Sequence, residues 1–291
     1  MKKTLTTLVA MAGACAFYAA SPAMAGSTSE PGESVGGAPG AAAPPGLYFV
    51  EEDNWGQRST PLGKSTLGVN INALAWWTPW TIAGGHLQFL AVVPTAEVGI
   101  PNGTPVAGYI NGAFNPILAS TLAWNLGGGM NVSGTVLGYL PESSPVADPT
   151  GSIEGRLGLS YLKDGWNFSA NLLYGMHTTD QSMAGHPNYF NADLTAAKKL
   201  GKWEVGAVGY YSTDTQDSND TFSGIIGKQS QFALGALVGY DWGPLTTQVY
   251  VTHDVWQQNY GGEDMRIWAR VVVPLGDPLA GSSPPSNMYH K

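Results

Sequence analysis

Residues 166–177 read WNFSANLLYGMH, and this stretch decides the fold. One set of alternate positions is apolar: Trp166, Phe168, Ala170, Leu172, Tyr174 and Met176. The other set is mostly polar or small: Asn167, Ser169, Asn171, Gly175 and His177. A period of two is typical of a β-strand, and a helix does not produce it. The stretch therefore predicts a strand whose two faces meet different surroundings.

The same alternation recurs on both sides of this stretch, in twelve segments altogether. These are Leu47–Asp53, Leu67–Trp77, His86–Val93, Pro116–Trp124, Met130–Leu140, Ser152–Leu162, Trp166–His177, Tyr189–Leu200, Trp203–Ser212, Ser230–Asp241, Leu245–Trp256 and Glu263–Leu275. The connections after even-numbered segments are short, and most of those after odd-numbered segments are long. That arrangement is typical of outer-membrane barrels, whose short turns are periplasmic. We therefore expect an all-β fold, a transmembrane antiparallel up-and-down β-barrel of about 12 strands over residues 47–275.

The composition supports this prediction and excludes several classes of protein. Charged residues make up 12% of the chain, about half the usual share of a soluble domain. A mean hydropathy of −0.05 excludes a bundle of membrane helices. The net charge of −8 argues against a nucleic-acid partner, which needs a basic surface. A soluble β-sandwich is the alternative, but it does not explain the aromatic residues near the short turns: Trp76, Trp77, Trp80, Trp124, Tyr161, Trp166, Trp203, Tyr240 and Trp242.

The N-terminus predicts export. Lys2 and Lys3 precede an uncharged apolar stretch, and Ala23-Met24-Ala25 supplies the small-residue cleavage signature. Residues 1–25 are therefore interpreted as a signal peptide, and the mature chain is expected in the outer membrane. A lipoprotein cleavage box before Cys15 is the alternative, although it lacks the usual leucine. Cleavage after Ala25 leaves a mature chain without cysteine.

Two further segments flank the predicted barrel. Residues 26–46 are rich in Gly, Pro, Ser and Ala and have no hydrophobic period, so they cannot build a core. We interpret them as a periplasmic linker or a plug of the barrel. Residues 276–291 are interpreted as a flexible C-terminal tail.

Several stretches resemble a known family. Residues 165–180, 186–218 and 232–244, together with the opening run Pro44–Phe49, are similar to the outer-membrane proteins labelled "MetA-pathway of phenol degradation", or SphA-like transporters. The resemblance covers roughly residues 44–275 and implies a barrel and transport. The label's link to phenol breakdown is one of genomic association rather than of chemistry. A tail after Leu275 departs from the family, whose members tend to end close to the last strand.

The polar positions within the segments are the candidate site. A charge on the lipid face costs about 2–4 kcal/mol near the midplane, so we expect these side chains to face the lumen. They either brace the wall in pairs, such as Asp254 with Arg266, or line a conduit that selects the solute. Asp214 is assigned to a solvated acidic loop. The predicted lumen residues are Asn70, Asn72, Glu154, Arg156, Asn171, His177, Asp193, Glu204, Gln248, Asp254, Arg266 and Arg270.

These features predict a channel for passive passage of small, hydrophobic or aromatic solutes. Its expected partners are outer-membrane lipid, the solute and the barrel-insertion machinery. The sequence holds no dinucleotide, P-loop or zinc motif, so no cofactor, metal site or enzyme activity is expected. One alternative is a structural or adhesive barrel. Another is a lipid hydrolase at the rim, since counting from the turn at Trp242 places Ser230 beside His253, with Glu263 near.

Overall fold

The computed structural model describes residues 27–60, 63–101, 108–178, 187–220 and 225–279. Segments of alternating polarity form β-strands through most of these residues. The described strands are β1 (Gly46–Thr60), β2 (Gly63–Ile82), β3 (Gly85–Ile100), β4 (Gly108–Ala113), β5 (Ile117–Gly127), β6 (Met130–Tyr139), β7 (Ser152–Lys163), β8 (Trp166–His177), β9 (Tyr189–Leu200), β10 (Trp203–Asp214), β11 (Ser218–Asp220), β12 (Ile225–Gly227), β13 (Ser230–Asp241), β14 (Thr246–Gln258) and β15 (Asp264–Gly276). The predicted signal peptide and most of the predicted tail lie outside the described residues.

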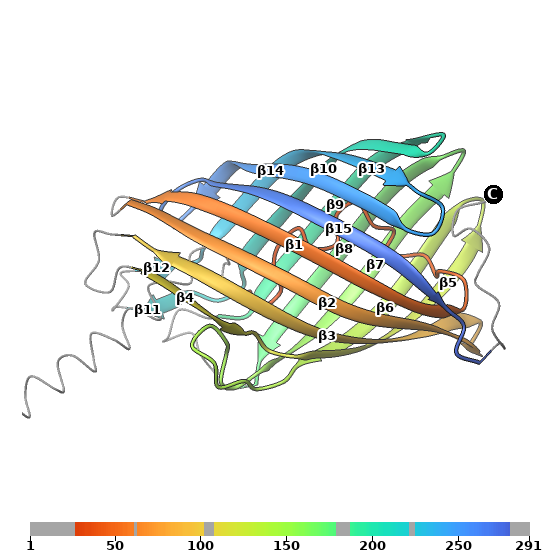
Figure 1. The fold of residues 1–291 in the computed structure, drawn as a ribbon. Coiled ribbons are helices and arrows are strands. Elements are labelled where there is room, and N and C mark those ends of the chain that lie inside the picture. Colours follow the sequence, from red (N-terminus) through yellow and green to blue (C-terminus); the bar gives the residue numbers. More distant parts are fainter. Residues whose placement is uncertain (1–26, 61–62, 102–107, 179–186, 221–224, 280–291) are drawn as a thin grey trace, which may run out of the picture.

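Twelve of these strands close into an antiparallel barrel, which confirms the predicted fold and strand number (Figure 1). Each of these twelve strands pairs with the barrel strands that precede and follow it, so that β3 pairs with β5 and β10 with β13. The first and last strands close the ring, in a ladder that runs from Arg58 opposite Asp264 to Leu47 opposite Gly276. Closure leaves no free edge within the ring, as a membrane requires. No helix among the described residues is long and apolar enough to cross a membrane.

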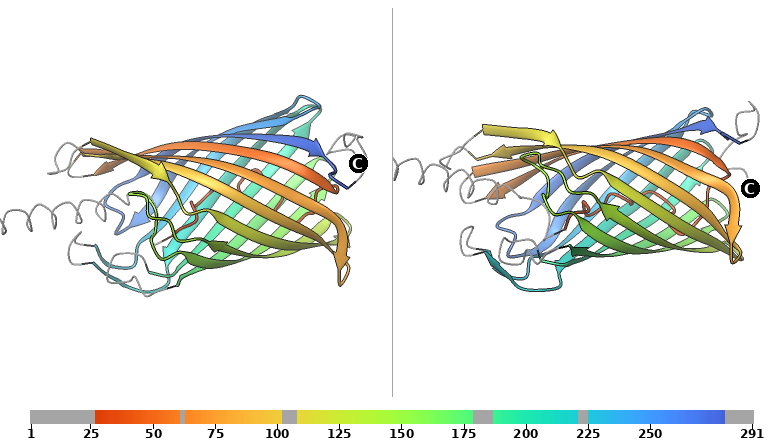
Figure 2. Two further views of the ribbon diagram at one scale, coloured as in Figure 1. Left: turned by 60° about the horizontal axis from the view of Figure 1, so that its bottom comes forward. Right: turned by 90° about the horizontal axis from the view of Figure 1, so that it is seen from below.

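The first three strands are longer than their sequence pattern predicts. β3 continues past β5, which begins with Ile117 opposite Val92, and its outer part pairs with the short strand β4 instead. β4 lies within a stretch that the alternation assigned to a loop. These strands reach beyond the rest of the barrel at the end with the long loops (Figure 2). Polar residues such as Asp53 and Asn54 made their outer halves look like loops.

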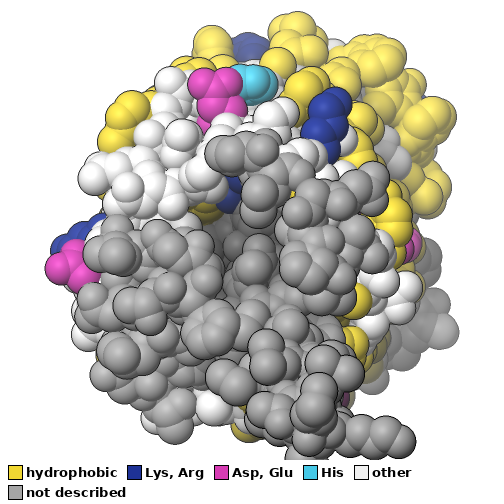
Figure 3. All heavy atoms as spheres, turned by 90° about the vertical axis from the view of Figure 1, so that its left-hand side faces the viewer, with side chains coloured by type: hydrophobic (Ala, Val, Ile, Leu, Met, Phe, Trp, Pro, Cys, Tyr) yellow, Lys and Arg dark blue, Asp and Glu magenta, His cyan; other side chains and the backbone are white. Residues whose placement is uncertain are grey.

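The outer wall is apolar where a membrane would surround it. Exposed side chains include Leu74, Val93, Leu118, Val136, Leu157, Leu194, Val238, Val249 and Ile267. Figure 3, which faces the end with the long loops, shows hydrophobic side chains gathered around part of this wall. Aromatic rings contact one another near the short turns: Trp166 and Phe168 are stacked at 5.0 Å between ring centroids, and Trp203 and Tyr240 meet edge to face at 4.7 Å. Trp77 is the exception, because it is buried and points into the lumen rather than into the predicted girdle.

Candidate functional site

The stretch between the predicted cleavage site and the barrel lies inside the barrel. Residues 27–45, here called the inner segment, run along the lumen and join β1 at the end with the short turns (Figures 1 and 2). Much of the segment is buried, with Val35 and Ser29 fully enclosed. The lumen is therefore occupied along part of its cross-section.

The inner segment is built from successive tight turns. Backbone hydrogen bonds join residues three apart, from Glu33 N to Glu30 O and from Val35 N to Gly32 O, both at 3.2 Å. Pro31 followed by Gly32, whose φ is +93°, suits a type II turn, in which only glycine adopts the second position easily. Gly36 has a φ of +77° in the same way. The Pro and Gly content thus gives a narrow ribbon that fits a barrel interior.

Close packing against the wall gives these two glycines a second role. A Cβ atom on Gly32 would come within 2.6 Å of the Tyr210 ring, and one on Gly36 within 2.4 Å of Leu237. Both distances are shorter than a real side-chain contact allows. The ribbon is therefore matched in shape to the wall formed by β10 and β13.

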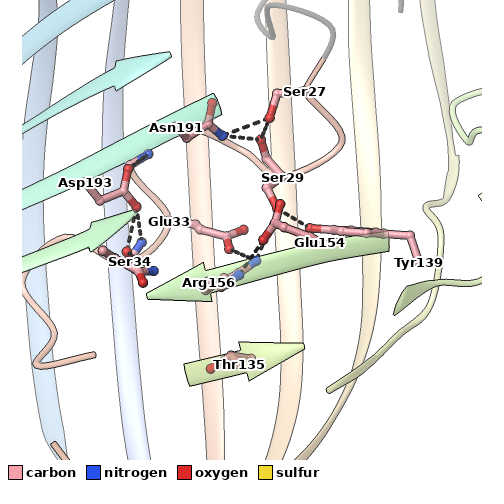
Figure 4. Close-up of polar contacts among 12 residues, drawn as sticks. Ser27, Ser29, Glu33, Ser34, Thr135, Tyr139, Glu154, Arg156, Asn191 and Asp193 are labelled. Atoms are coloured by element: carbon pink, nitrogen blue, oxygen red, sulfur yellow. Dashed lines mark hydrogen bonds and ion pairs between the residues drawn. The ribbon is translucent and has the colours of Figure 1, made fainter. Parts of the chain in front are cut away.

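Asp193 on β9 holds the middle of the inner segment. Its carboxylate accepts hydrogen bonds from Gly32 N at 2.9 Å, Ser34 N at 3.0 Å and Ser34 Oγ at 2.6 Å (Figure 4). Asn171 on β8 donates to the same Ser34 hydroxyl at 3.0 Å. Hydrogen bonds to a charged acceptor are about twice as strong as neutral ones. Asp193 is thus a central anchor of the segment.

Glu154 and Arg156 on β7 form a second anchor (Figure 4). Glu154 accepts hydrogen bonds from Ser29 Oγ at 2.5 Å and from the Tyr189 hydroxyl at 2.8 Å. Arg156 pairs with Glu154 and also with Glu33 of the inner segment, whose carboxylate lies 2.6 Å away. The buried Glu154 carboxylate is therefore satisfied partly by the wall and partly by the segment.

Arg266 and Arg270 on β15 form a third anchor and face the lumen. Arg266 pairs with Glu30 at 2.5 Å and with Asp264 at 2.7 Å. Arg270 pairs with Glu52 of β1 and donates to the backbone carbonyls of Val35 and Glu33. Both arginines thus join the barrel seam to the inner segment.

Burial also affects the carboxyls that the segment contributes. It raises the pKa of both Glu30 and Glu33 to about 7, with Arg266 and Arg156 opposing the change. These groups therefore take up protons more readily when the segment is docked than when it is free in water.

The remaining predicted lumen residues lie at different heights along the barrel axis. Gln248 donates to the Gly36 carbonyl at 3.0 Å and to Glu204 at 2.9 Å. His177, at the outer end of β8, has its Nδ1 3.0 Å from Asp148. Asp254 faces the lumen but accepts the backbone N–H of Asp264 at 2.9 Å. The predicted pairing of Asp254 with Arg266 is therefore wrong, because Arg266 binds Asp264 and Glu30 instead.

Asn70 and Asn72 face outward, contrary to the prediction. Their neighbours Val69, Ile71 and Ala73 line the lumen, so alternation puts both amides on the other face of β2. There Asn70 donates to Asp53 at 2.5 Å. The prediction assumed a polar lumen along the whole ring, whereas this part of the wall is apolar inside.

An elongated cavity of about 890 Å³ separates the inner segment from this apolar wall. Its lining comes mainly from β2, β3, β5 and β6 and includes Leu67, Val69, Ile71, Ala73, Ala75, Trp77, Leu90, Val92, Ala96, Val98, Ile117, Ala119 and Leu137. We call it the apolar lane. Residues 142–149 line it as well, and the buried Asn115 holds their loop through Asp148.

The proposed hydrolase residues do not come together. A bulge after Phe232 shifts the register, so that Ser230 lies opposite Gln258 and His253 opposite Leu234. Ser230 is thus five positions, or about 16 Å, along β14 from His253. The distance between His253 Nε2 and Glu263 is 4.0 Å, at the exposed rim. The prediction that Ser230 lies beside His253 is wrong.

Sequence reasoning missed the residues that the segment itself contributes. Ser29, Glu30, Glu33 and Ser34 carry many of its polar contacts, yet their stretch was interpreted only by composition. Glycines at every fourth position, together with two Pro-Gly pairs, are the signal that could have indicated an ordered turn ribbon. Asp214 was also misplaced, because it ends β10 and is buried rather than solvated.

Comparisons with known proteins agree with this architecture. A family model described as "Putative MetA-pathway of phenol degradation" matches residues 51–271. The COG4313 outer membrane channel from Pseudomonas putida F1 has a similar fold, with a TM-score of 0.69 and 12% identity over 84% of this chain and 99% of that one. The β-domain of the Bordetella autotransporter BrkA aligns with a TM-score of 0.51 and 11% identity, over 80% and 100% of the two chains. No curated protein matches the chain.

Proposed function

This chain belongs to the family described as "Putative MetA-pathway of phenol degradation" and is an outer-membrane β-barrel; from this premise we propose that it is a channel for small apolar solutes, aromatic ones included. The observation that carries the proposal is the apolar lane. The inner segment occupies the polar side of the lumen, so the space that it leaves is bounded largely by aliphatic side chains.

The volume and the lining of the lane support a small, apolar solute. A volume of about 890 Å³ lies within the range of ligand pockets and accommodates a small aromatic or aliphatic molecule. Apolar walls offer few hydrogen-bond partners to a solute such as a sugar, which is large enough to lose much of its hydration shell in the lane. Apolar solutes form no such hydrogen bonds in water, and their entry into the lane is favourable by roughly 25 cal/mol for each Å² of apolar surface that is removed from water. We infer that the lane discriminates by desolvation rather than by specific hydrogen bonds.

The test measures single-channel current in planar bilayers. Toluene is expected to interrupt the current while it occupies the lane, whereas glycerol, which is polar and no larger, is expected to leave the current unchanged. Replacing Ala73 by Trp fills the middle of the lane and should abolish the interruptions and lower the current at least tenfold. Leu74→Trp is the matched control, since the adjacent side chain faces outward on the same strand.

Three outcomes would contradict the proposal. Equal interruption by toluene and glycerol would remove the claim of apolar selectivity. An unchanged current in Ala73→Trp would place the route elsewhere in the barrel. A wild-type barrel that carries no current would favour the structural or adhesive alternative instead.

A further inference from the structure

The inner segment begins deep within the protein. Ser27, its first described residue, is buried, and its hydroxyl donates to the carbonyl of Ser29 at 2.5 Å. The Asn191 side chain on β9 donates to the same hydroxyl at 2.8 Å (Figure 4). Ser27, which follows the predicted cleavage site by two residues, is therefore tied to the lumen wall at β9.

Three buried acceptor atoms around this point have no hydrogen-bond partner within the described part of the chain. They are Asn191 Oδ1, Ser212 Oγ and Asp214 Oδ1. Ser212 lies directly opposite Asn191 in the β9–β10 ladder, and Asp214 is two residues further along β10. All three side chains point inward and are almost completely buried. The other oxygen of Asp214 accepts the backbone N–H of Gln229, at 2.9 Å.

Such a group of acceptors is unfavourable unless a donor fills it. A buried polar atom without a hydrogen-bond partner is unfavourable, and the positive charge that acts on the buried Asp214 carboxylate comes from Lys228, which is itself exposed. A donor with several N–H groups and a positive charge would satisfy all three atoms at once. It must also fit close to Ser27.

Cleavage after Ala25 would create this donor. The new α-amino group of Gly26 carries three N–H groups and a positive charge below its pKa of about 7.7–8.0. It is one residue from Ser27, so it lies within about 5 Å of the Ser27 Cα atom. In the uncleaved chain the same nitrogen is a neutral peptide N–H with a single donor.

We propose that Asn191, Ser212 and Asp214 form a socket for the α-ammonium group of the processed chain. The socket couples processing to docking: the inner segment is fully held only after the signal peptide has been removed. The inference does not depend on which solute the lane carries.

The test compares amine reactivity in folded barrels that begin at Gly26. An amine-acetylating reagent is applied at pH 7, and acetylation of the N-terminus and of the lysines is followed separately by mass spectrometry. The wild-type α-amine should react at least tenfold more slowly than that of Asp214→Asn. Asp241→Asn is the control, since this carboxylate ends β13 at the short-turn end and caps the Gly243 N–H.

A second variant keeps the test independent of Asp214. Two alanines placed before Gly26 move the ammonium out of reach, so a Cys introduced at the enclosed position Val35 should react with maleimide at least tenfold faster than in the unextended chain. Heat-modifiable gel mobility confirms that each barrel is folded. The proposal is overturned if the wild-type α-amine reacts as fast as in the unfolded chain, if Asp214→Asn leaves its rate unchanged, or if the mature chain starts elsewhere than at Gly26.

Discussion

Replacing Asp193 by Ala should release the inner segment from the lumen wall without unfolding the barrel. The change removes three hydrogen bonds to the segment, from Gly32 N, Ser34 N and Ser34 Oγ. A hydrogen bond to a charged group contributes about 1.5–3 kcal/mol, so the three together set an upper limit of about 5–9 kcal/mol. Water that enters the vacated site restores much of this, and we expect a net loss of about 3 kcal/mol, or roughly a 100-fold rise in the released fraction.

Asp193→Asn should give an intermediate effect. One carboxylate oxygen accepts from Gly32 and the other from both groups of Ser34. An amide keeps one acceptor oxygen but presents N–H donors in place of the second. At least one bond is therefore lost, and we expect about a tenfold rise in release.

A single cysteine at Val35 reports the release. The processed chain contains no other cysteine if cleavage follows Ala25, and Val35 is fully enclosed when the segment is docked. The maleimide reaction rate should rise in the order wild type, Asp193→Asn, Asp193→Ala. Asp254→Ala is the control, since this lumen carboxylate accepts a bond from Asp264 and none from the segment. An unchanged rate in Asp193→Ala, or an equal rise in the control, would refute the reasoning.

Three further predictions concern other contacts. Gly32→Ala places a Cβ 2.6 Å from the Tyr210 ring at a φ of +93°, so it should raise the labelling rate of the same cysteine reporter at least tenfold. Burial raises the pKa of Glu33 to about 7, so docking of the inner segment takes up a proton, and the segment should be held more firmly at pH 5.5 than at pH 8. The conductance of the barrel should therefore rise from pH 5.5 to pH 8, and Glu33→Gln should flatten this pH profile. On β15, Val271→Arg faces the middle of the lipid band and should cost about 2–4 kcal/mol, whereas Met265→Arg near the outer edge should cost about 0–1 kcal/mol, as heat-modifiable gel mobility would show.

The fold was predictable because period-two alternation and turn length are local properties of the sequence. The predicted bounds of β8, β9 and β13 agree with the structure to the residue. The extra strand β4 and the long outer halves of β1 to β3 were not predictable in this way. There the outward face carries polar residues such as Asp53 and Asn70, so the alternation no longer shows an apolar face toward lipid and a polar face toward the lumen.

The lumen was less predictable than the wall, because polarity identifies the inner face only if water fills the barrel. In LGVNINALAWW, residues 67–77, the polar Asn70 and Asn72 invited an inward assignment. The opposite face holds Leu67, Val69 and Ile71, which line an apolar lumen. Contacts between the inner segment and β9 join residues 159–161 positions apart, and no local pattern contains that information.

The division of the lumen between a docked ribbon and an apolar lane has a consequence for how such barrels diversify. Each of the twelve strands completes its hydrogen bonds with two neighbours, and the ribbon adds none to that ladder. The width of the lumen and the polarity of its lining can therefore change through insertions, deletions or substitutions in the inner segment that precedes the first strand. None of the residues that meet lipid, or that guide assembly into the membrane, has to change with them. The same barrel wall can in this way be combined with different inner segments, and selection for a different solute can act on the inner segment alone.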